Sequence, residues 1–400
     1  MVDLTKKPGE TLRQYIARVG QAKDNGEIDL TWDELVPLLN EQTGENFSEG
    51  TYRQKWVEGK KWYEEVFSKI TPSDYLTELR TAQIELSKTK MQVQDQRREF
   101  NSVLRVDARF DHLLDYIKNA VDRLNADHPL EFNMIDTGSS RGREAVLVFA
   151  DLHYGMQAEN IWGVYNTQIC RQRIQQTVNE TIEAIRLHGV EKLYVIALGD
   201  LIHGAIHVAC RVTSEEDTVD QLMHVSELLA EAIAELANHV NQVEVYSTYG
   251  NHARTIQNKK ESVHSDNLEK IFPWFLQWRL SEFRNVKICE SEYYEFISLR
   301  PCGYTMVCSH GDLERFRDFG VTVNTIFTKK YGMAVDYTIT ADKHHLEEFE
   351  QLGIESVLTR SLCGTDEYSN GHRLYSTPGQ TLMIFADGKG RECTYHIRFG

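Results

Sequence analysis

From residue 145 onward, the chain alternates short apolar runs with helical patterns. The apolar runs are, in chain order, "AVLVFADLHYG", "KLYVIALGD", "QVEVYSTYGNH", "GYTMVCSHGD" and "VDYTITADKHH". Helical stretches such as "RQRIQQTVNETIEAIRLHG" and "TVDQLMHVSELLAEAIAELANHV" lie between them. Strands that alternate with helices are typical of an α/β domain, in which ligands gather where the strands end. We therefore predict an α/β fold for residues 145–400.

Each of these runs ends in side chains of the kinds that bind metal ions. Taken singly, each would be an ordinary surface or core residue, and the chain has 15 histidines. Their recurrence at successive strand ends is different, because neighbouring strands bring their ends into one cleft. Carboxylate, imidazole and amide ligands together suit Mn, Fe, Mg or Zn in octahedral or five-coordinate sites. The candidates are Asp151, His153, Asp200, Asn251, His252, His310, Asp342, His344 and His345.

The order of these motifs, D-x-H, G-D, G-N-H, S-H-G and x-x-x-H-H, resembles the calcineurin-like metallophosphoesterases over residues 145–400. The stretch "ADLHYG" looks more like the D-x-H-x-G of SbcD-type DNA-repair nucleases than the motif of the protein phosphatases. "GNHAR" and "SLCGTDEYSNGHRLYSTPGQTLMIF" are similar to phage-encoded members of the DNA-repair exonuclease type. The resemblance implies a four-layer sandwich, in which two mixed sheets are flanked by helices, with an all-α extension before it.

The resemblance also implies a role for each ligand around two divalent cations. By this resemblance, the first metal would be held by Asp151, His153 and His344, and the second by Asn251 and His310. The carboxylate of Asp200 would bridge the two metals, and His252 would lie beside the scissile phosphate. Two positions depart from the family. Asp342 stands where the family's G-H-x-H has a histidine, and His203 stands where an acid often pairs with the catalytic histidine.

Asp342 bears on the choice of metal, because a carboxylate oxygen favours Mg and Mn while imidazole suits Zn and Fe. We therefore expect two manganese ions, with Mg, Fe or Zn as alternatives, and Asp342 as a ligand of the second. The competing interpretation is that Asp342 has left the metal shell and that His344 or His345 serves the second site. Arg254 is a candidate phosphate clamp or an ordinary surface ion pair, and Tyr154 could stack on a base or pack in the core.

Residues 1–70 are predicted to form a small helical domain that resembles a helix-turn-helix. Apolar residues recur at helical spacing in "GETLRQYIARVGQAK". Thr31 and Glu34 have capping-box spacing at the start of a second helix that closes near Gly44. We expect a DNA-binding module, with a protein-binding helical module as the alternative. The third helix carries the side chains expected near DNA, which are Tyr52, Arg53, Gln54, Lys55, Lys60 and Lys61.

Residues 71–144 are expected to form a long helical spacer followed by a polar linker. Apolar residues recur every seven positions from Leu79 to Phe100, but the companion seam is polar. A stable coiled coil needs both seams, so the helix 73–125 should be half exposed and could serve as a homo-oligomer contact. Its later part, "FDHLLDYIKNAVDRL", is more amphipathic and is expected to pack on another element.

Composition limits the partners of the chain. The net charge of −16 would repel nucleic acid from most of the surface, so any such contact must be local. The seven cysteines include no C-x-x-C pair, which favours reduced thiols in a cytoplasmic protein, in the host cytoplasm if the chain is phage-encoded. No apolar run approaches the roughly 20 residues that span a membrane, so we expect no membrane association.

Together these features predict a two-metal phosphoesterase that hydrolyses phosphodiester bonds, with a DNA exonuclease or endonuclease as the leading hypothesis. A phosphatase or phosphodiesterase acting on a protein or a small nucleotide is the alternative. A DNA-binding protein with a vestigial metal site is disfavoured by the intact ligand set. SbcD-like enzymes usually work with an ATPase partner, so the resemblance implies a partner subunit of that kind besides DNA.

Overall fold

The computed structural model of the chain forms two compact units, Met1–Ala108 and Arg109–Gly400. Each unit has a hydrophobic core of its own. The residues that the structure describes are 3–70, 83–91, 93–94, 112–134, 142–206, 208–259, 262–263, 266–293 and 295–400.

The first unit contains the helices α1 (Leu12–Asp24), α2 (Trp32–Thr43) and α3 (Glu49–Ile70). The predicted capping box is present, because the hydroxyl of Thr31 accepts from the backbone of Glu34 while the Glu34 carboxylate accepts from the backbone of Thr31. Gly44 ends α2 with a φ of 72°, a left-handed conformation that glycine adopts without a steric penalty. The predicted all-α N-terminal region is therefore confirmed.

The core of the first unit lies where α1, α2 and α3 meet, and its buried side chains include Tyr15, Val19, Leu35, Leu39, Tyr52 and Trp56. Tyr52 corrects one expectation, since its side chain is buried and its hydroxyl donates to Asn40 Oδ1 over 2.9 Å. It holds α3 against α2 and is not available to a ligand. The cations of α3 are exposed, namely Arg53, Lys55, Lys60 and Lys61.

The expected spacer is helical over residues 83–91 and 112–127. The remaining parts of the predicted helix 73–125, and the glycine-containing part of the linker, lie outside the described residues. Those parts are residues 73–82, 92, 95–111 and 135–141.

The later part of the spacer packs on the second unit, as its amphipathic pattern predicts. Ile117 and Val121 are buried in the main core of that unit. Phe132 of the expected linker also packs there, with its ring centroid 5.3 Å from that of Phe283. The second unit, Arg109–Gly400, therefore includes the described residues 112–134, whose apolar side chains complete its core.

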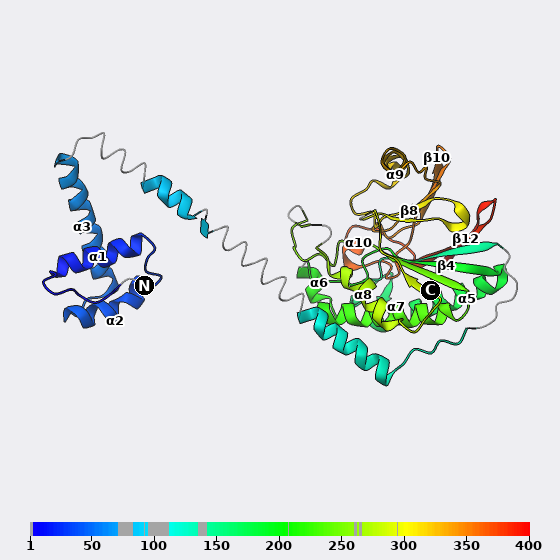
Figure 1. Ribbon diagram of the computed structural model, residues 1–400, viewed down its shortest axis with the longest axis horizontal. Coiled ribbons are helices and arrows are strands. Elements are labelled where there is room, and N and C mark those ends of the chain that lie inside the picture. Colours follow the sequence, from blue (N-terminus) through cyan, green and yellow to red (C-terminus); the bar gives the residue numbers. More distant parts are fainter. Residues whose placement is uncertain are drawn as a thin grey trace. The chain divides into compact units, whose positions relative to one another are not determined.

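A six-stranded sheet in the order β13-β12-β1-β4-β5-β6 forms the centre of the second unit. Strands β1, β4, β5 and β6 are parallel, and β12 and β13 are added in antiparallel orientation. Helices α5, α7 and α8 cover one face of this sheet (Figure 1). The bounds are β1 Arg143–Phe149, α5 Thr167–His188, β4 Val190–Ala197, α7 Thr218–Ala237, β5 Gln242–Ser247, α8 Ile271–Arg279, β6 Val286–Ile288, β12 Gly379–Ala386 and β13 Gly390–Arg398.

A second sheet, of five strands in the order β10-β11-β9-β8-β7, packs against the other face of the first. β11, β9 and β8 are parallel, while β10 and β7 are antiparallel edge strands. Helix α9 covers the outer face of this sheet through Val323 and Phe327. The bounds are β7 Ile297–Leu299, β8 Met306–Cys308, α9 Phe316–Tyr331, β9 Tyr337–Thr340, β10 Glu347–Gln351 and β11 Ile354–Leu358.

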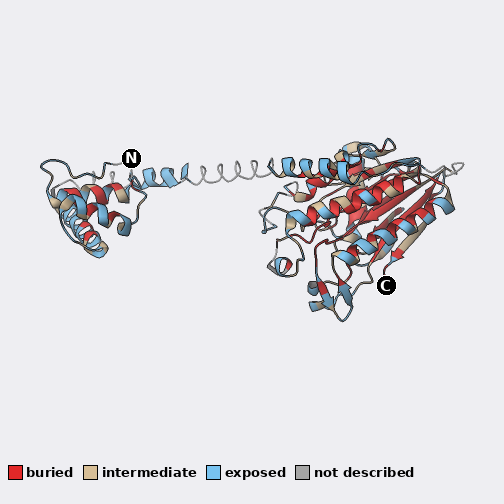
Figure 2. Cartoon of the chain, turned by 90° about the horizontal axis from the view of Figure 1, so that it is seen from below, coloured by how far each residue is buried: buried red, intermediate tan, exposed pale blue. Residues whose placement is uncertain are grey.

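The alternation of side chains along β1 explains how it joins two layers. Leu147 and Phe149 pack against the helices, whereas Val146 and Val148 pack against the second sheet. Successive strand residues point to opposite faces, so an uninterrupted apolar run is what a strand buried on both sides requires. Figure 2 shows the middle of the sheet buried, and residues 145–149 of β1 and 193–197 of β4 are all buried. The predicted four-layer sandwich is therefore confirmed.

Short elements occupy the connections between the sheets. They are β2 (Ala158–Asn160), β3 (Gly163–Tyr165), α6 (Val208–Val212), α10 (Glu367–Gly371) and the 3-10 turns η1 (Leu268–Lys270) and η2 (Pro301–Gly303). β2 and β3 pair as an antiparallel hairpin. Within the described ranges, no helix has both the length and the apolar character needed to cross a lipid bilayer.

Candidate metal centre

The predicted ligands follow five strands that belong to both sheets. Asp151 follows β1, Asp200 follows β4, Asn251 follows β5, His310 follows β8 and Asp342 follows β9. β1, β4 and β5 are parallel neighbours, and so are β8 and β9, so their carboxyl ends meet at one edge of each sheet. The structure thus brings together the side chains that the strand-end pattern singles out.

Several of the predicted ligands have a strained backbone conformation. Eight non-glycine residues in the described chain have a positive φ, and five of them are predicted ligands. A left-handed backbone costs a side-chain-bearing residue about 1–3 kcal/mol and persists where surrounding structure enforces it, often at functional sites. The five are Asp151, His153, Asp200, Asp342 and His344, with φ values of 49°, 44°, 51°, 66° and 61°.

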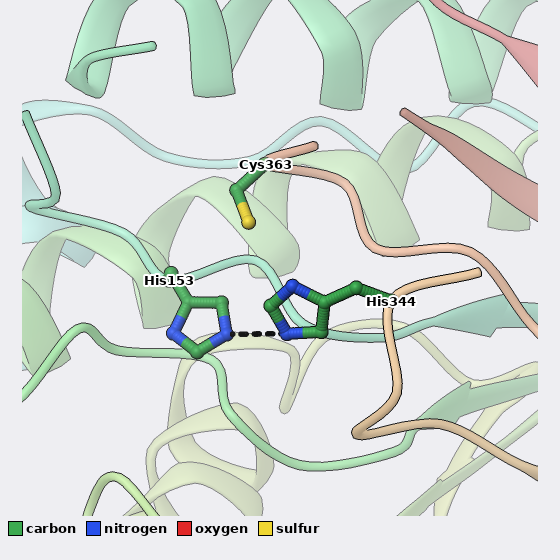
Figure 3. A group of neighbouring side chains, drawn as sticks. All are labelled: His153, His344 and Cys363. Carbon is green, nitrogen blue, oxygen red and sulfur yellow. Dashed lines mark hydrogen bonds between the residues drawn. The ribbon is translucent and has the colours of Figure 1, made fainter. Parts of the chain in front are cut away.

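Two imidazoles face each other in the first predicted site. Figure 3 shows His153 and His344 with their Nε2 atoms pointing together, and the two atoms lie 3.2 Å apart. His153 Nε2 is also 3.9 Å from Asp200 Oδ2. The sulfur of Cys363 lies to one side of the two rings and within 4.8 Å of a ligand atom on each. Burial holds the pKa of this thiol well above its usual value, so it is neutral here.

The second predicted site adjoins the first through Asp200. Asp200 Oδ2 lies 3.3 Å from His310 Nε2, which is 3.7 Å from Asp342 Oδ1. The amide of Asn251 donates to that same Asp342 oxygen over 2.9 Å. His345, by contrast, is exposed. Asp342, and not His345, therefore lies beside the other predicted ligands of the second site.

An unpaired buried atom tests whether these residues suit divalent cations. Oδ1 of Asp151 is buried and has no hydrogen-bond partner in the described structure. An unpaired buried polar group costs about 1–3 kcal/mol, and a cation would satisfy it. Two nitrogen ligands about 2.0–2.1 Å from one ion lie roughly 3.0–3.4 Å apart, which matches the 3.2 Å between His153 and His344. The residues present therefore fit a cation centre.

Burial and close charges set the pKa values of the central acids. Burial raises the pKa of Asp151 to about 6, although the imidazoles of His344 and His310 oppose the rise. Burial acts on Asp200 in the same direction, but His310 and His252 hold the pKa of that carboxyl well below its usual range. Asp200 thus stays ionised more readily than Asp151, which suits the bridging role that the resemblance implies for it.

The predicted catalytic His252 lies beside the first site. Its ring centroid is 4.5 Å from that of His153, and its backbone N–H donates to Asp200 Oδ1 over 2.8 Å. Its Nδ1 donates to the backbone carbonyl of His203 over 2.8 Å, so a main-chain oxygen orients the ring where the family often uses an acid. Although burial opposes it, the negative charge of Asp200 raises the pKa of His252 to about 9.

The contacts of two neighbouring side chains bear on alternatives that the sequence leaves open. The guanidinium of Arg254 donates to the carbonyls of Asn251, Ile256 and Gln257 over 2.8, 3.1 and 2.9 Å, so it braces its own loop and is not free to clamp a phosphate. Tyr154 is buried and its hydroxyl donates to Glu216, so packing in the core is its role and stacking on a base is not.

Glu269 is a part of the centre that the sequence pattern did not reveal. Its carboxylate accepts from the backbone N–H of Leu201 over 2.6 Å and from that of Gly250 over 2.7 Å. These residues immediately follow Asp200 and precede Asn251, so one buried carboxylate ties together two ligand loops. Burial and the charge of Asp200 raise the pKa of Glu269 to about 7. An acid in a short turn gives no sequence signal for such a role.

A cavity of about 1010 Å³ opens over the centre. Its walls include His153, Asp200 and His252 on one side and the segment from Gly364 to Ser376 on the other. Such a volume lies at the upper end of the roughly 300–1,000 Å³ typical of small-molecule sites. The centre is therefore accessible to a substrate larger than a simple phosphate ester.

Comparison with known proteins agrees with this geometry. The calcineurin-like phosphoesterase family matches residues 145–350, and the YonJ N-terminal domain family matches residues 1–71. Over 407 aligned residues, the chain is 26% identical to the "SPbeta prophage-derived uncharacterized protein YonJ" of Bacillus subtilis (strain 168), and the alignment covers 98% of each chain.

Solved structures with a similar chain fold include a novel archaeal phosphodiesterase, at 15% identity and a TM-score of 0.32, covering 64% of this chain and 99% of that one. They also include wild-type Vps29 complexed with zinc from Entamoeba histolytica, at 14% identity and a TM-score of 0.28, with the same coverage. The assignment rests on the family match and the ligand geometry, not on these two. The chain, a homologue of a prophage-derived protein, belongs to the calcineurin-like phosphoesterase family and is a metal-dependent phosphoesterase.

Proposed function

We propose that this phosphoesterase is a DNA nuclease that hydrolyses phosphodiester bonds. The observation that supports it most is the position of Asp200 Oδ2, which is 3.9 Å from His153 Nε2 and 3.3 Å from His310 Nε2. One carboxylate can therefore serve two adjacent cation sites. Two cations about 3.5–4 Å apart stabilise the attacking and leaving oxygens of an in-line displacement at phosphorus.

Hydrolysis also needs a proton donor for the leaving group. His252 would donate a proton to the leaving oxygen, because it lies beside the first site and its Nδ1 is already committed to a carbonyl. Although burial opposes it, the charge of Asp200 raises the pKa of His252 to about 9, and cations bound to Asp200 would lower this pKa because a nearby positive charge disfavours the imidazolium. An acid whose pKa lies near the working pH is the most effective proton donor.

Three features favour DNA over a phosphoprotein or a small nucleotide. The D-x-H-x-G motif resembles that of SbcD-type nucleases, and the cavity of about 1010 Å³ admits more than a phosphomonoester. The exposed cations of α3 would supply a local contact for the DNA backbone in a chain whose net charge is −16. The same resemblance leads us to propose an ATPase partner subunit.

We propose manganese as the metal of the second site. Asp342 lies among its ligands and leaves His310 as the only nitrogen donor of the predicted set Asp200, Asn251, His310 and Asp342. Oxygen-rich sites favour Mg and Mn over Zn. The second site should accordingly be the weaker and more exchangeable one, because it has fewer imidazoles than the first.

The deciding experiment is a substrate panel with added Mn. Single- and double-stranded DNA, cyclic nucleotides and phosphopeptides would be incubated with the wild type and with Asp200→Asn as the matched inactive control. We expect cleavage of DNA by the wild type and none by the variant. Turnover of phosphopeptides or cyclic nucleotides while DNA stays intact would contradict the nuclease proposal in favour of the alternative activity.

A further inference from the structure

Two exposed aromatic side chains, Trp162 and Tyr375, stack on each other, and each has an exposed aliphatic neighbour in the sequence, Ile161 and Leu374; these four residues are called the patch below. Ile161 and Trp162 lie at the turn of the β2–β3 hairpin, with exposed fractions of 79% and 44%, and Leu374 and Tyr375 have exposed fractions of 60% and 52%. The rings of Trp162 and Tyr375 stack, with centroids 4.4 Å apart and planes 28° from parallel. Single exposed apolar residues are common, but a contiguous patch of them usually marks a binding surface.

Hydrogen bonds hold this aromatic pair in place. Trp162 Nε1 donates to Asn370 Oδ1 over 3.2 Å, and Asn160 Nδ2 donates to the carbonyl of Thr365 over 3.0 Å. The hairpin is thereby fixed to the segment that carries Tyr375. A ring pair that is already ordered loses little conformational entropy when it binds a ligand.

Two residues of the patch line the cavity that opens over the metal centre. Leu374 and Tyr375 line the same cavity as Asp200 and His252, and Arg373 lines it beside them. Arg373 is exposed and has a positive φ of 60°, a strained conformation that survives where the surroundings enforce it. A guanidinium matches the paired oxygens of a phosphate. The cavity therefore presents a flat apolar surface and a cation on the same side.

We infer that Trp162 and Tyr375 stack against a nucleobase next to the scissile phosphate, and that Arg373 contacts a phosphate of the same strand. The inference rests on the proposed nuclease function and narrows its substrate to a strand whose bases are unpaired at the site. A base inside a duplex has both faces covered, so it could not extend the ring stack. Aromatic side chains recognise unpaired bases of any identity through their faces.

A protein partner fits the same surface less well. The patch adjoins the phosphoesterase centre, so a bound protein would cover the mouth of the cavity. A nucleotide strand instead satisfies the ring face, the cation and the centre together. The occupant that we assign is therefore the substrate itself.

The experiment compares two chromogenic diesters that differ only in the base. One is the p-nitrophenyl ester of thymidine 5′-phosphate and the other is the corresponding ester of abasic 1,2-dideoxyribose. Both release p-nitrophenol, so the ratio of their kcat/KM values isolates base recognition. The proteins are the Mn-loaded wild type, Tyr375→Ala, Tyr375→Phe as the variant that keeps a ring, and Tyr116→Ala as an exposed tyrosine outside the cavity.

We expect the wild type to prefer the thymidine ester by about 5- to 150-fold, the usual range for one stacked base. Tyr375→Ala should bring the ratio of the two kcat/KM values close to one, because KM for the thymidine ester rises. Tyr375→Phe and Tyr116→Ala should keep the ratio of the wild type. A wild-type ratio near one, a ratio that Tyr375→Ala leaves unchanged, or equal losses on both esters would overturn the inference. A wild type that holds two Mn and hydrolyses neither ester would contradict the proposed function itself.

Discussion

Asn251 Nδ2 donates to Asp342 Oδ1 over 2.9 Å, and this contact joins the end of a strand in one sheet to the end of a strand in the other. The same Asp342 oxygen lies 3.7 Å from His310 Nε2. A cation held by Asn251 and His310 would therefore also contact Asp342. An anionic oxygen replaces the neutral nitrogen that the family usually has at this position.

The first prediction follows from that replacement. Asp342→Ala should weaken Mn binding at the second site by roughly 10-fold or more, because one charged ligand is lost, while the first site keeps its metal. Asp342→His should shift the preference toward Zn or Fe, which imidazole suits better. Calorimetric metal titrations would measure both changes.

Glu367→Ala is the matched control for this titration, because Glu367 is an exposed acid that lines the same cavity outside the ligand cluster. It should leave both Mn affinities unchanged. Unchanged stoichiometry and affinity in Asp342→Ala would rule out Asp342 as a ligand.

The second prediction separates the proton donor from the ligands. His252→Ala should slow turnover by roughly 10²–10⁴, the usual size of a general acid–base contribution, and should keep both metals. Asp200→Asn should instead lose activity together with the metals, since the charge that both sites share is removed. Metal content measured beside kcat tests this. A His252→Ala protein without its metals would show that the roles are wrongly assigned.

The sequence predicted the ligand cluster because the signal for it is local. Asp151 and Asp200 each follow an uninterrupted apolar strand, and parallel strands must bring such ends together. Tyr52 and Tyr154 could not be placed in the same way, since an amphipathic ring suits a core and a binding surface equally well. Only the packing around each ring decides between them.

The sequence pattern could not predict contacts that are made through backbone atoms. Glu269 binds the N–H groups of Leu201 and Gly250, which any residue at those positions would offer. For Arg254 the sequence offered a phosphate clamp or a surface ion pair, whereas carbonyls of its own loop bind its guanidinium. No residue type in the sequence marks these partners, because the fold alone brings them within reach.

The third prediction concerns the buried Glu269 and its pKa of about 7. In an unfolded chain a glutamate titrates near 4.3, so the folded state binds more protons between these two values. The contribution of Glu269 to the stability of the metal-free protein should therefore fall as pH rises from about 4.3 to about 7, and this loss should level off above that range. Replacing the acid by the non-titrating Glu269→Gln should remove this part of the pH dependence.

Thermal unfolding with a chelator, from pH 4.5 to 7.5, measures the effect. As the pH rises across this range, the Tm of the wild type should fall relative to the Tm of Glu269→Gln. The variant should also be less stable at low pH, because the amide offers one acceptor for two N–H donors. A difference in Tm that is constant with pH would contradict the raised pKa.

The fourth prediction tests the N-terminal unit. Replacing Arg53, Lys55, Lys60 and Lys61 together by glutamine should weaken duplex DNA binding and reduce its salt slope by about 0.9 for each lost phosphate contact. Lys60 should contribute least, because it already pairs with Asp24 over 2.7 Å. Hydrolysis of a small chromogenic diester should stay the same, since the metal centre lies in the other unit. An unchanged salt slope would favour a protein-binding role.

The last prediction distinguishes a loop brace from a phosphate clamp at Arg254. Its guanidinium donates to the carbonyl of Asn251 over 2.8 Å and to two further carbonyls of the same loop. Arg254→Lys should therefore lower Mn affinity at the second site by about 10-fold, the lower range for outer-shell changes at metal sites, because one ammonium group cannot satisfy three diverging acceptors.

Inhibition by inorganic phosphate, measured at saturating Mn, supplies the contrast. Arg254→Lys should leave the inhibition constant unchanged, because the guanidinium is turned into its loop and away from substrate. Arg373→Ala should raise that constant, since Arg373 lines the cavity and has no ion pair within the described residues. If Arg254→Lys raised the constant and kept normal Mn affinity, Arg254 would be a phosphate ligand after all, and its loop contacts would have to open when substrate binds.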